Sequence, residues 1–197
     1  MPWRKFKTRR TWNEPGHAHE LTFCCYRRYP FLRADRTRQW FLNALQMARR
    51  RFPLELWAYV IMPEHVHLLL WPTSADVDIG AVRKAVKLAV SRRAIAHIRE
   101  YHPEWLERLR VTWPDGRVEH HFWQAGGGYD RNLLREDAVW AAIDYIHANP
   151  VRRGLCRIPE DWEWSSARWY AGVRPTILEM DGPPPTPTPG TITRRRR

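Results

Sequence analysis

The sequence has little cysteine and no long apolar run. Three cysteines occur among 197 residues, Cys24 and Cys25 side by side and Cys156 far from them. They form neither a disulfide framework nor a CxxC metal knuckle, so we expect reduced thiols that mostly fill the core. No apolar run approaches the roughly 18 residues of a transmembrane helix. The basic segment from Met1 to Thr11 is not followed by an apolar stretch, so we expect no secretory signal and a cytoplasmic protein.

Acidic residues are also in the minority. Asp and Glu total 21 against 33 Lys and Arg, which gives a formal charge of +12 and a pI of about 10.3. This charge predicts a polyanionic partner, either nucleic acid or an anionic membrane surface. The chain has no Gly-rich phosphate loop and no internal repeat, which excludes a P-loop nucleotide site and a solenoid. A hydrophobic fraction of 44% excludes a wholly disordered chain.

The composition changes at residue 173. Residues 173–197 are rich in proline and end in four arginines, a composition that tends to polyproline II or disorder. Five arginines less two acidic residues give this segment a charge of +3, which leaves +9 on residues 1–172. We therefore expect a folded, basic domain over 1–172 and a tail over 173–197.

The pattern of apolar residues predicts alternating strands and helices over residues 1–172. We expect strands over 19–27, 54–62 and 65–71, a hairpin over 110–123, and helices over 36–52 (capped by Asp35), from Asp76 or Asp78 to about Glu100, over 135–148, and after Ser165-Ser166. Pro63-Glu64 joins two strands into a hairpin, and Asn149-Pro150 should end the third helix. The order predicts an α+β, ferredoxin-like (split β-α-β) antiparallel sheet with helices on one face and a further C-terminal helix. RNA-recognition modules use the open face of such a sheet.

Two local patterns could carry chemistry. His65 and His67 alternate along a strand, so both imidazoles should lie on one face and could hold one divalent cation. Most His-x-His matches are structural, but the centre of a hairpin favours a site here. Tyr145 and Asn149 are four residues apart and share a helix face. An ordinary packing tyrosine and a helix-ending Asn-Pro would give the same pattern.

Other histidines and tyrosines compete with these candidates. His17 and His19 repeat the His-x-His spacing, although Pro15-Gly16 indicates a loop there. The adjacent His120 and His121 would point to opposite faces of a strand. The rival phenols, none followed by an amide four residues later, are Tyr101, Tyr129 and Tyr170.

Several blocks occur together in one order. They are Met62-Pro63-Glu64-His65-Val66-His67-Leu68-Leu69, Phe122-Trp123-Gln124 with Gly128-Tyr129-Asp130-Arg131, Tyr145-Ile146-His147-Ala148-Asn149-Pro150-Val151-Arg152-Arg153-Gly154-Leu155, and Trp162 with Trp164-Ser165-Ser166-Ala167. Over residues 10–171 the chain thereby resembles the HUH-superfamily single-tyrosine transposases of single-strand insertion sequences, and among them the REP-associated tyrosine transposases. The proline-rich tail lies outside the resemblance.

The resemblance implies a function and a set of site residues. His65 and His67 would be ligands of Mg²⁺ or Mn²⁺, and Asn149 would be a third ligand where the family usually has a longer amide. Tyr145 would be the nucleophile. Such enzymes cut single-stranded DNA beside a hairpin, form a 5′-phosphotyrosine and leave a free 3′-OH. They act as monomers or homodimers, and we expect this one in the cytoplasm with the nucleoid.

Basic and aromatic side chains could supply the DNA-binding surface, because single strands are bound by basic grooves with stacking platforms. The candidates are Arg83, Lys84, Lys87, Arg131, Arg152 and Arg153, with the neighbouring pairs Trp3-Arg4 and Arg168-Trp169. Two alternatives stay open. One is a domesticated, non-cleaving protein on this fold that binds hairpin DNA or RNA, and the other is a metal-dependent hydrolase that uses water and no covalent intermediate.

Overall fold

A four-stranded antiparallel sheet organises the molecule. The computed structural model describes Asn13 and residues 16–182. The sheet order is β2-β3-β1-β6, with bounds Leu54–Ile61 (β2), His65–Pro72 (β3), Ala18–Cys24 (β1) and Tyr129–Leu133 (β6). Strand β1 pairs antiparallel with β3 on one side and β6 on the other. This order confirms the predicted split β-α-β plan.

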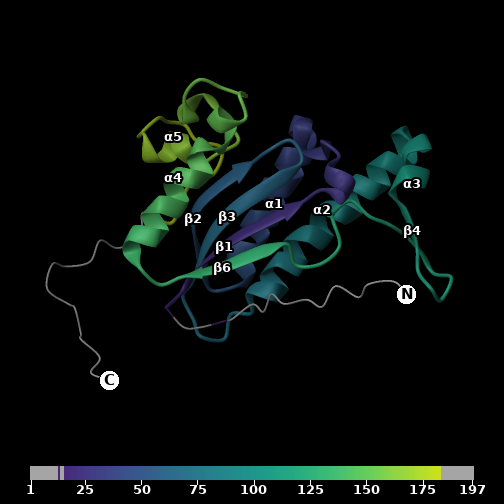
Figure 1. The fold of residues 1–197 in the computed structure, drawn as a ribbon, viewed down its shortest axis with the longest axis horizontal. Coiled ribbons are helices and arrows are strands. Elements are labelled where there is room, and N and C mark those ends of the chain that lie inside the picture. The colour runs from purple at the N-terminus through teal and green to yellow at the C-terminus, as the bar shows by residue number, and fades with distance from the viewer. Residues whose placement is uncertain (1–12, 14–15, 183–197) are drawn as a thin grey trace, which may run out of the picture.

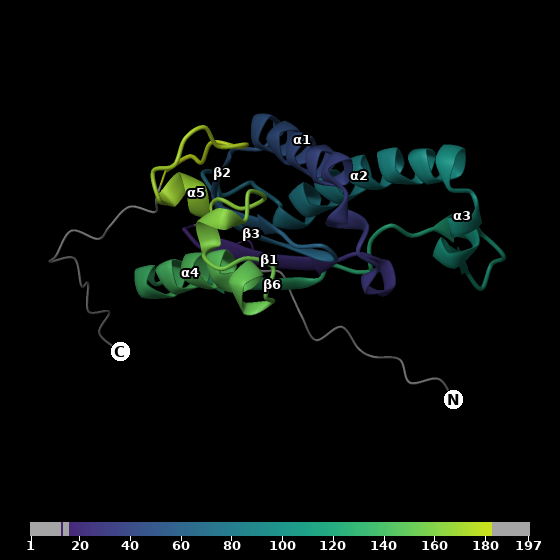
Figure 2. The ribbon, with the colours of Figure 1, turned by 90° about the horizontal axis from the view of Figure 1, so that it is seen from above.

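Helices lie on both faces of the sheet (Figures 1 and 2). Helices α1 (Asp35–Arg51) and α2 (Ile79–Tyr101) pack together over one face, and α4 (Glu136–Arg152) packs on the other. The second face is therefore partly covered by the C-terminal helix and is not wholly open.

Alternating side chains of β1 and β3 supply two apolar cores. Leu21 and Leu68 join the core beneath α1 and α2, whereas Ala18 and Leu69 join the core beneath α4. Because β3 is buried on both faces, its sequence is nearly continuous in apolar residues. His65 and His67 share the parity of Leu69, so they lie on the α4 face.

Shorter elements surround these layers. They are η1 (Tyr26–Arg28), η2 (Phe31–Arg33), α3 (Glu104–Leu109), β4 (Arg110–Thr112), β5 (Val118–His120), η3 (Pro159–Asp161) and α5 (Ala167–Tyr170). The predicted hairpin over 110–123 is present, but β4 and β5 form a separate two-stranded sheet. The fourth strand of the main sheet is β6, which was not predicted because a mostly polar segment after three glycines does not resemble a strand.

Two helix ends differ from the sequence expectation. Helix α4 does not stop at Asn149-Pro150 but continues through Pro150 to Arg152. A proline near a helix C-terminus removes one hydrogen bond, and the backbone N–H of Arg153 still closes the last turn on the Asn149 carbonyl at 3.1 Å. Asp35 is the first residue of α1 and not its cap, and its carboxylate accepts from the Arg38 guanidinium at 3.0 Å.

The first part of the predicted tail is packed against the domain. Leu178 and Met180 are buried in the core under α1 and α2, and the Asp181 carboxylate accepts from the backbone N–H of Leu56 at 2.8 Å. The packed region thus extends past residue 172, because two apolar side chains in this stretch fill the core. Residues 183–197, like Trp3-Arg4, lie outside the described residues. In the part that the structure describes, no helix is long and apolar enough to cross a membrane.

Candidate active site

The two histidines of β3 face each other at the edge of the α4 core. His65 Nε2 and His67 Nε2 are 3.1 Å apart, and both side chains are largely buried. The sequence prediction that the two imidazoles share one face is confirmed. The two nitrogens are close enough that His65 and His67 could together hold a single divalent ion.

Each imidazole is fixed through its other nitrogen. His65 Nδ1 lies 3.1 Å from Glu64 Oε1, and His67 Nδ1 lies 2.8 Å from the Thr22 hydroxyl on β1. The Glu64 carboxylate also accepts from Arg153 Nη1 at 3.0 Å, which ties the end of α4 to His65. Metal-binding histidines generally carry a partner of this kind on the second nitrogen, because it fixes the ring and its tautomer.

The donor set fits a divalent ion. Burial and the neighbouring His65 lower the pKa of His67 to about 3, and burial also lowers the pKa of His65. Both rings are therefore neutral at pH 7. Because the Glu64 carboxylate accepts, the His65 proton sits on Nδ1 and its Nε2 presents a lone pair. The Thr22 hydroxyl can accept from or donate to His67 Nδ1, so His67 Nε2 can present a lone pair or a proton to the same point.

Further ligands would have to come from an amide, water or substrate. Among the described residues, no group of three or more His, Cys, Asp or Glu side chains is arranged to hold a metal ion. Two imidazoles alone leave most coordination positions of a divalent ion open.

Tyr145 lies next to this pair. Its ring packs edge-on against His67, with centroids 5.6 Å apart and an interplanar angle of 86°, and its side chain is 42% exposed. The Arg152 guanidinium stands 5.3 Å from the centre of the same ring. The spacing of residues in the sequence does not predict this contact between Tyr145 and His67. It arises because α4 packs on the sheet.

A pocket of about 480 Å³ opens between α4 and the sheet at this point. It is lined by Glu20, Thr22, His67, Tyr129, Arg131, Ala141, Ala142 and Tyr145. Thr22, Glu64 and Glu20 were absent from the sequence-based site. Glu64 could have been found from its position directly before His-x-His. Thr22 and Glu20 could not, because they reach the site through the pairing of β1 with its neighbouring strands.

Asn149 stays close to its own helix. Its amide Nδ2 donates to the Tyr145 carbonyl at 2.7 Å, and the residue is 8% exposed. This bond holds the side chain on the same helix face as Tyr145, as its spacing predicted. Its role as a metal ligand remains a prediction.

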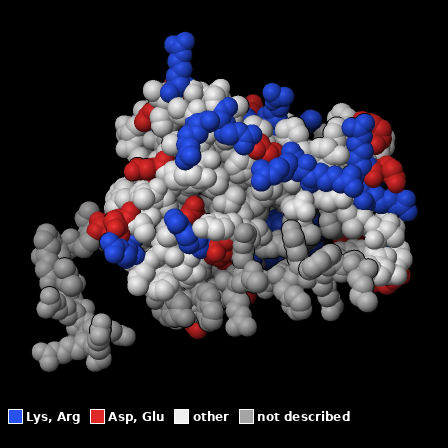
Figure 3. Space-filling view, viewed as in Figure 1, with Lys and Arg blue, Asp and Glu red and all other residues white. Residues whose placement is uncertain are grey.

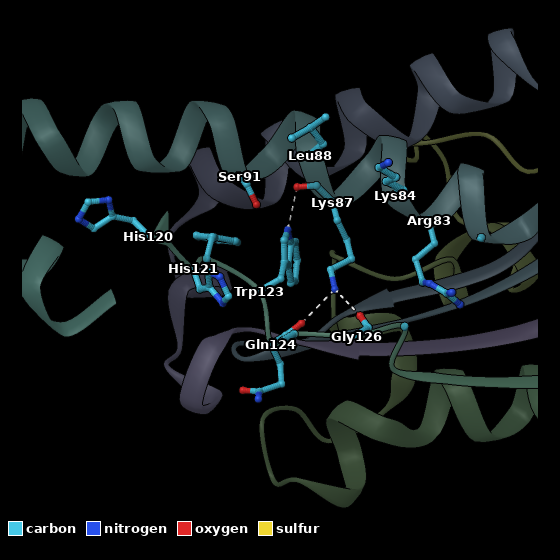
Figure 4. Close-up of a pocket in the computed structure, with 14 residues that line it drawn as sticks. Arg83, Lys84, Lys87, Leu88, Ser91, His120, His121, Trp123, Gln124 and Gly126 are labelled. Atoms are coloured by element: carbon cyan, nitrogen blue, oxygen red, sulfur yellow. Dashed lines mark hydrogen bonds between the residues drawn. The ribbon is translucent and has the colours of Figure 1, made fainter. Parts of the chain in front are cut away.

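The six basic residues predicted to bind DNA do not form one surface. Arg131, Arg152 and Arg153 lie on the α4 side, and Arg131 pairs with Glu20 at 2.9 Å. Arg83, Lys84 and Lys87 lie on α2, beyond the opposite face of the sheet, and line a second pocket (Figure 4). Lys and Arg side chains also gather over the half of the molecule that holds α3 (Figure 3).

The rival candidates lie in other surroundings. His19 is fully buried on the α1–α2 face, where its Nδ1 lies 3.0 Å from Asp130 Oδ1, so it belongs to the other side of the sheet. The Tyr170 hydroxyl donates to the Trp57 carbonyl at 2.7 Å, and Tyr101 is exposed at the end of α2. Tyr129 lines the same pocket as Tyr145, the candidate catalytic pocket, and is the rival phenol that needs an experimental control.

A ferredoxin-like sheet that places a His-x-His pair against a helix-borne tyrosine is the arrangement expected of a single-tyrosine transposase. The chain is 29% identical over 143 residues to a Haemophilus influenzae protein provisionally named REP-associated tyrosine transposase, a match that covers 72% of this chain and 73% of the relative. It is 22% identical over 124 residues to the REP-associated tyrosine transposase of Escherichia coli, covering 63% of this chain and 61% of that protein.

A solved structure has the same fold. It is a REP-associated tyrosine transposase bound to a REP hairpin, with a TM-score of 0.64, 18% identity, and coverage of 93% of this chain and all of that one. No protein-family model matches the chain. The two relatives and the shared fold confirm the resemblance to REP-associated tyrosine transposases and the predicted class of enzyme, a transposase.

Proposed function

We propose that this transposase is a metal-dependent endonuclease and strand transferase that cuts single-stranded DNA beside a hairpin through a 5′-phosphotyrosine. The observation that carries the proposal is the contact of the Tyr145 ring with His67, whose Nε2 meets that of His65 at 3.1 Å. A nucleophile and a candidate ion site thus open on one pocket.

Tyr145 is the attacking group in this proposal. Its phenolic oxygen gives up its proton and bonds to the phosphorus while the bond from phosphorus to the 3′ oxygen breaks, and the released 3′ oxygen takes up a proton. The phosphotyrosine retains the energy of the phosphodiester, so attack by a 3′-OH rejoins strands without a nucleotide cofactor. The Arg152 guanidinium beside the ring attracts the phosphate toward the phenol.

The ion would be Mg²⁺ or Mn²⁺, held by His65, His67 and the Asn149 amide. When bound, it would polarise a non-bridging phosphate oxygen and orient the phosphate. Neutral imidazoles suit this task, because they add no charge and leave positions for phosphate oxygens. Thr22 and Glu64 hold the two rings in the required orientation.

The DNA substrate is proposed from the relatives and from charge. A REP hairpin is bound to the solved relative, and the present chain carries a net charge of +12. Hairpin-bearing single strands in the cytoplasm, where the nucleoid lies, are therefore the proposed target. The protein would act there as a monomer or a homodimer.

A covalent adduct tests the proposal. Incubation with Mg²⁺ or Mn²⁺ and a hairpin-bearing single strand should give a protein–DNA species that survives denaturing electrophoresis. Tyr145→Phe should abolish it, whereas Tyr129→Phe, which changes another phenol of the same pocket, should retain it. If the adduct were lost in Tyr129→Phe and retained in Tyr145→Phe, the nucleophile would be Tyr129 and not Tyr145.

A histidine substitution and the products of the reaction distinguish the proposal from its two alternatives. His65→Ala should abolish cleavage and leave much of the DNA binding. Cleavage without any adduct would point to a hydrolase that uses water, and binding without cleavage under all metal conditions would point to a non-cleaving hairpin-binding protein.

A further inference from the structure

A second pocket lies on the side of the sheet away from the histidine pair. It has a volume of about 410 Å³ and lies between α2 and the segment His120–Gly127 (Figure 4). Helix α2 contributes Arg83, Lys84, Lys87 and Ser91, and the segment contributes imidazole, indole and amide side chains. Among the residues that the structure describes, none that lines this pocket carries a carboxylate. A pocket of this size and charge suits one nucleotide unit with its phosphate.

The pocket is built around two of its cations. Lys87 Nζ donates to the carbonyls of Gln124 and Gly126 at 3.1 and 3.0 Å, which anchors the loop to α2. Arg83 pairs with Asp130 at 3.4 Å beneath the same loop. Lys84 is exposed at the rim, so it is the cation most accessible to a ligand.

The same loop separates this pocket from the catalytic one. A side chain on Gly127 would meet Arg83 Nη2 at 2.8 Å, and one on Gly128 would meet the Thr22 carbonyl oxygen at 2.2 Å. The loop therefore runs tightly from the basic pocket to β1, and the next residue, Tyr129, lines the catalytic pocket. The two pockets thus lie on opposite faces of the sheet near its edge strand β6, and a DNA strand that occupied both would have to pass around this edge.

We infer that the basic pocket binds a nucleotide of the single-stranded DNA that flanks the cleaved phosphate, with Lys84 contacting its backbone phosphate. The inference rests on the proposed function, since it assigns the path of that substrate. It adds a strand-holding site that is separate from the nucleophile and the ion. Such a site would hold the flanking strand while the phosphotyrosine awaits its acceptor.

The test compares Lys84→Ala with Arg93→Ala, an exposed arginine of the same helix outside the pocket lining. Binding is measured by fluorescence anisotropy, without divalent ions, on one hairpin whose single-stranded flanks grow from none to about 12 nucleotides. The wild type and Arg93→Ala should gain affinity when the flank reaches the pocket. On the longer flanks Lys84→Ala should bind about fivefold more weakly than the wild type at about 0.1 M salt. The slope of log affinity against log salt concentration should be shallower by about 0.7, as expected for one lost phosphate contact on a single strand.

Three results would overturn the inference. They are equal affinity of Lys84→Ala and wild type at every flank length, an equal loss on the hairpin without flanks, and equally tight Lys84-dependent binding of an RNA flank. Photocrosslinking of halogenated uracil in the flank gives an independent readout on the unmodified wild type. Crosslinks should fall in residues 120–127, and crosslinks confined to α4 would refute the assignment.

Failure of this inference is distinguishable from failure of the proposed function. Adduct formation by the wild type and by Arg93→Ala, measured on hairpin DNA at saturating concentration, reports the proposed chemistry separately from the pocket. If the wild type forms no adduct on any substrate, the proposed chemistry fails, while the flank-length series still decides whether the pocket holds DNA.

Discussion

Gly128 is a position where a single added methyl group should affect both the fold and the candidate active site. Its φ is +75°, and a Cβ there would lie 2.2 Å from the Thr22 carbonyl oxygen. Gly126, two residues earlier, has a φ of +89°, and no atom of the described residues would lie within 4 Å of a Cβ added there. The two glycines therefore separate the cost of backbone conformation from the cost of a clash.

The expected magnitudes follow from this difference. Gly126→Ala should lower the free energy of unfolding by about 1–2 kcal/mol, the cost of a left-handed conformation for a residue with a Cβ. Gly128→Ala carries the same cost and must also move β6 away from β1. Losing about two cross-strand hydrogen bonds at roughly 1 kcal/mol each brings its total to about 3–4 kcal/mol. That is a large fraction of a typical domain stability of about 5–15 kcal/mol.

Urea unfolding followed by tryptophan fluorescence measures both free energies. Because the Thr22 hydroxyl holds His67, Gly128→Ala should also weaken Mn²⁺ binding, whereas Gly126→Ala should not. Equal destabilisation by the two variants would show that the approach of the loop to β1 is not tight, and the reasoning would be refuted.

Three further predictions address the ion site, pH and the packed tail. Glu64→Gln should weaken Mn²⁺ binding by about tenfold or more in an electron paramagnetic resonance titration, because the charge linking His65 and Arg153 is lost; unchanged affinity would contradict the positioning role. Burial lowers the pKa of His147 to about 4, so the unfolded chain binds its proton first as pH falls, and stability should decrease from about pH 6.5 to pH 4, by up to roughly 3 kcal/mol. His147→Asn should flatten this part of the pH profile in urea unfolding, and an unaltered profile would count against it. A chain ending at residue 172 should lose about 3 kcal/mol or more relative to one ending at 182, because Leu178 is buried; equal melting temperatures would show that the segment adds no stability.

Local patterns predicted most of the elements and part of the site. The alternation on either side of Pro63-Glu64 predicted the β2–β3 hairpin, and the parity of His65 and His67 placed both rings on one face. The helical spacing of Tyr145 and Asn149 was also correct, although the helix continues past Pro150. These features depend on backbone geometry within a few residues, which sequence periodicity reports directly.

The fourth strand and the two-sided cover of the sheet could not be predicted in this way. Strand β6 consists mostly of polar residues after Gly126–Gly128, and it is a strand because it pairs with β1, more than a hundred residues earlier. The positions of the basic residues could not be predicted from the sequence either. Arg83 and Arg131 looked equivalent in the sequence, but α2 and β6 place them in different pockets.

The sequence by itself determined which residues could carry the chemistry: a basic chain, an imidazole pair on one strand face and a phenol on a helix. Only the tertiary structure decided that α4 packs on the histidine face, so that Tyr145 meets His67. It also decided that Thr22 and Glu64 fix the two imidazoles and that Arg153 links the end of α4 to His65 through Glu64. The physical reason is that periodicity fixes which way a side chain points from its own element, whereas the contacts of a site depend on packing between elements that are far apart in the chain.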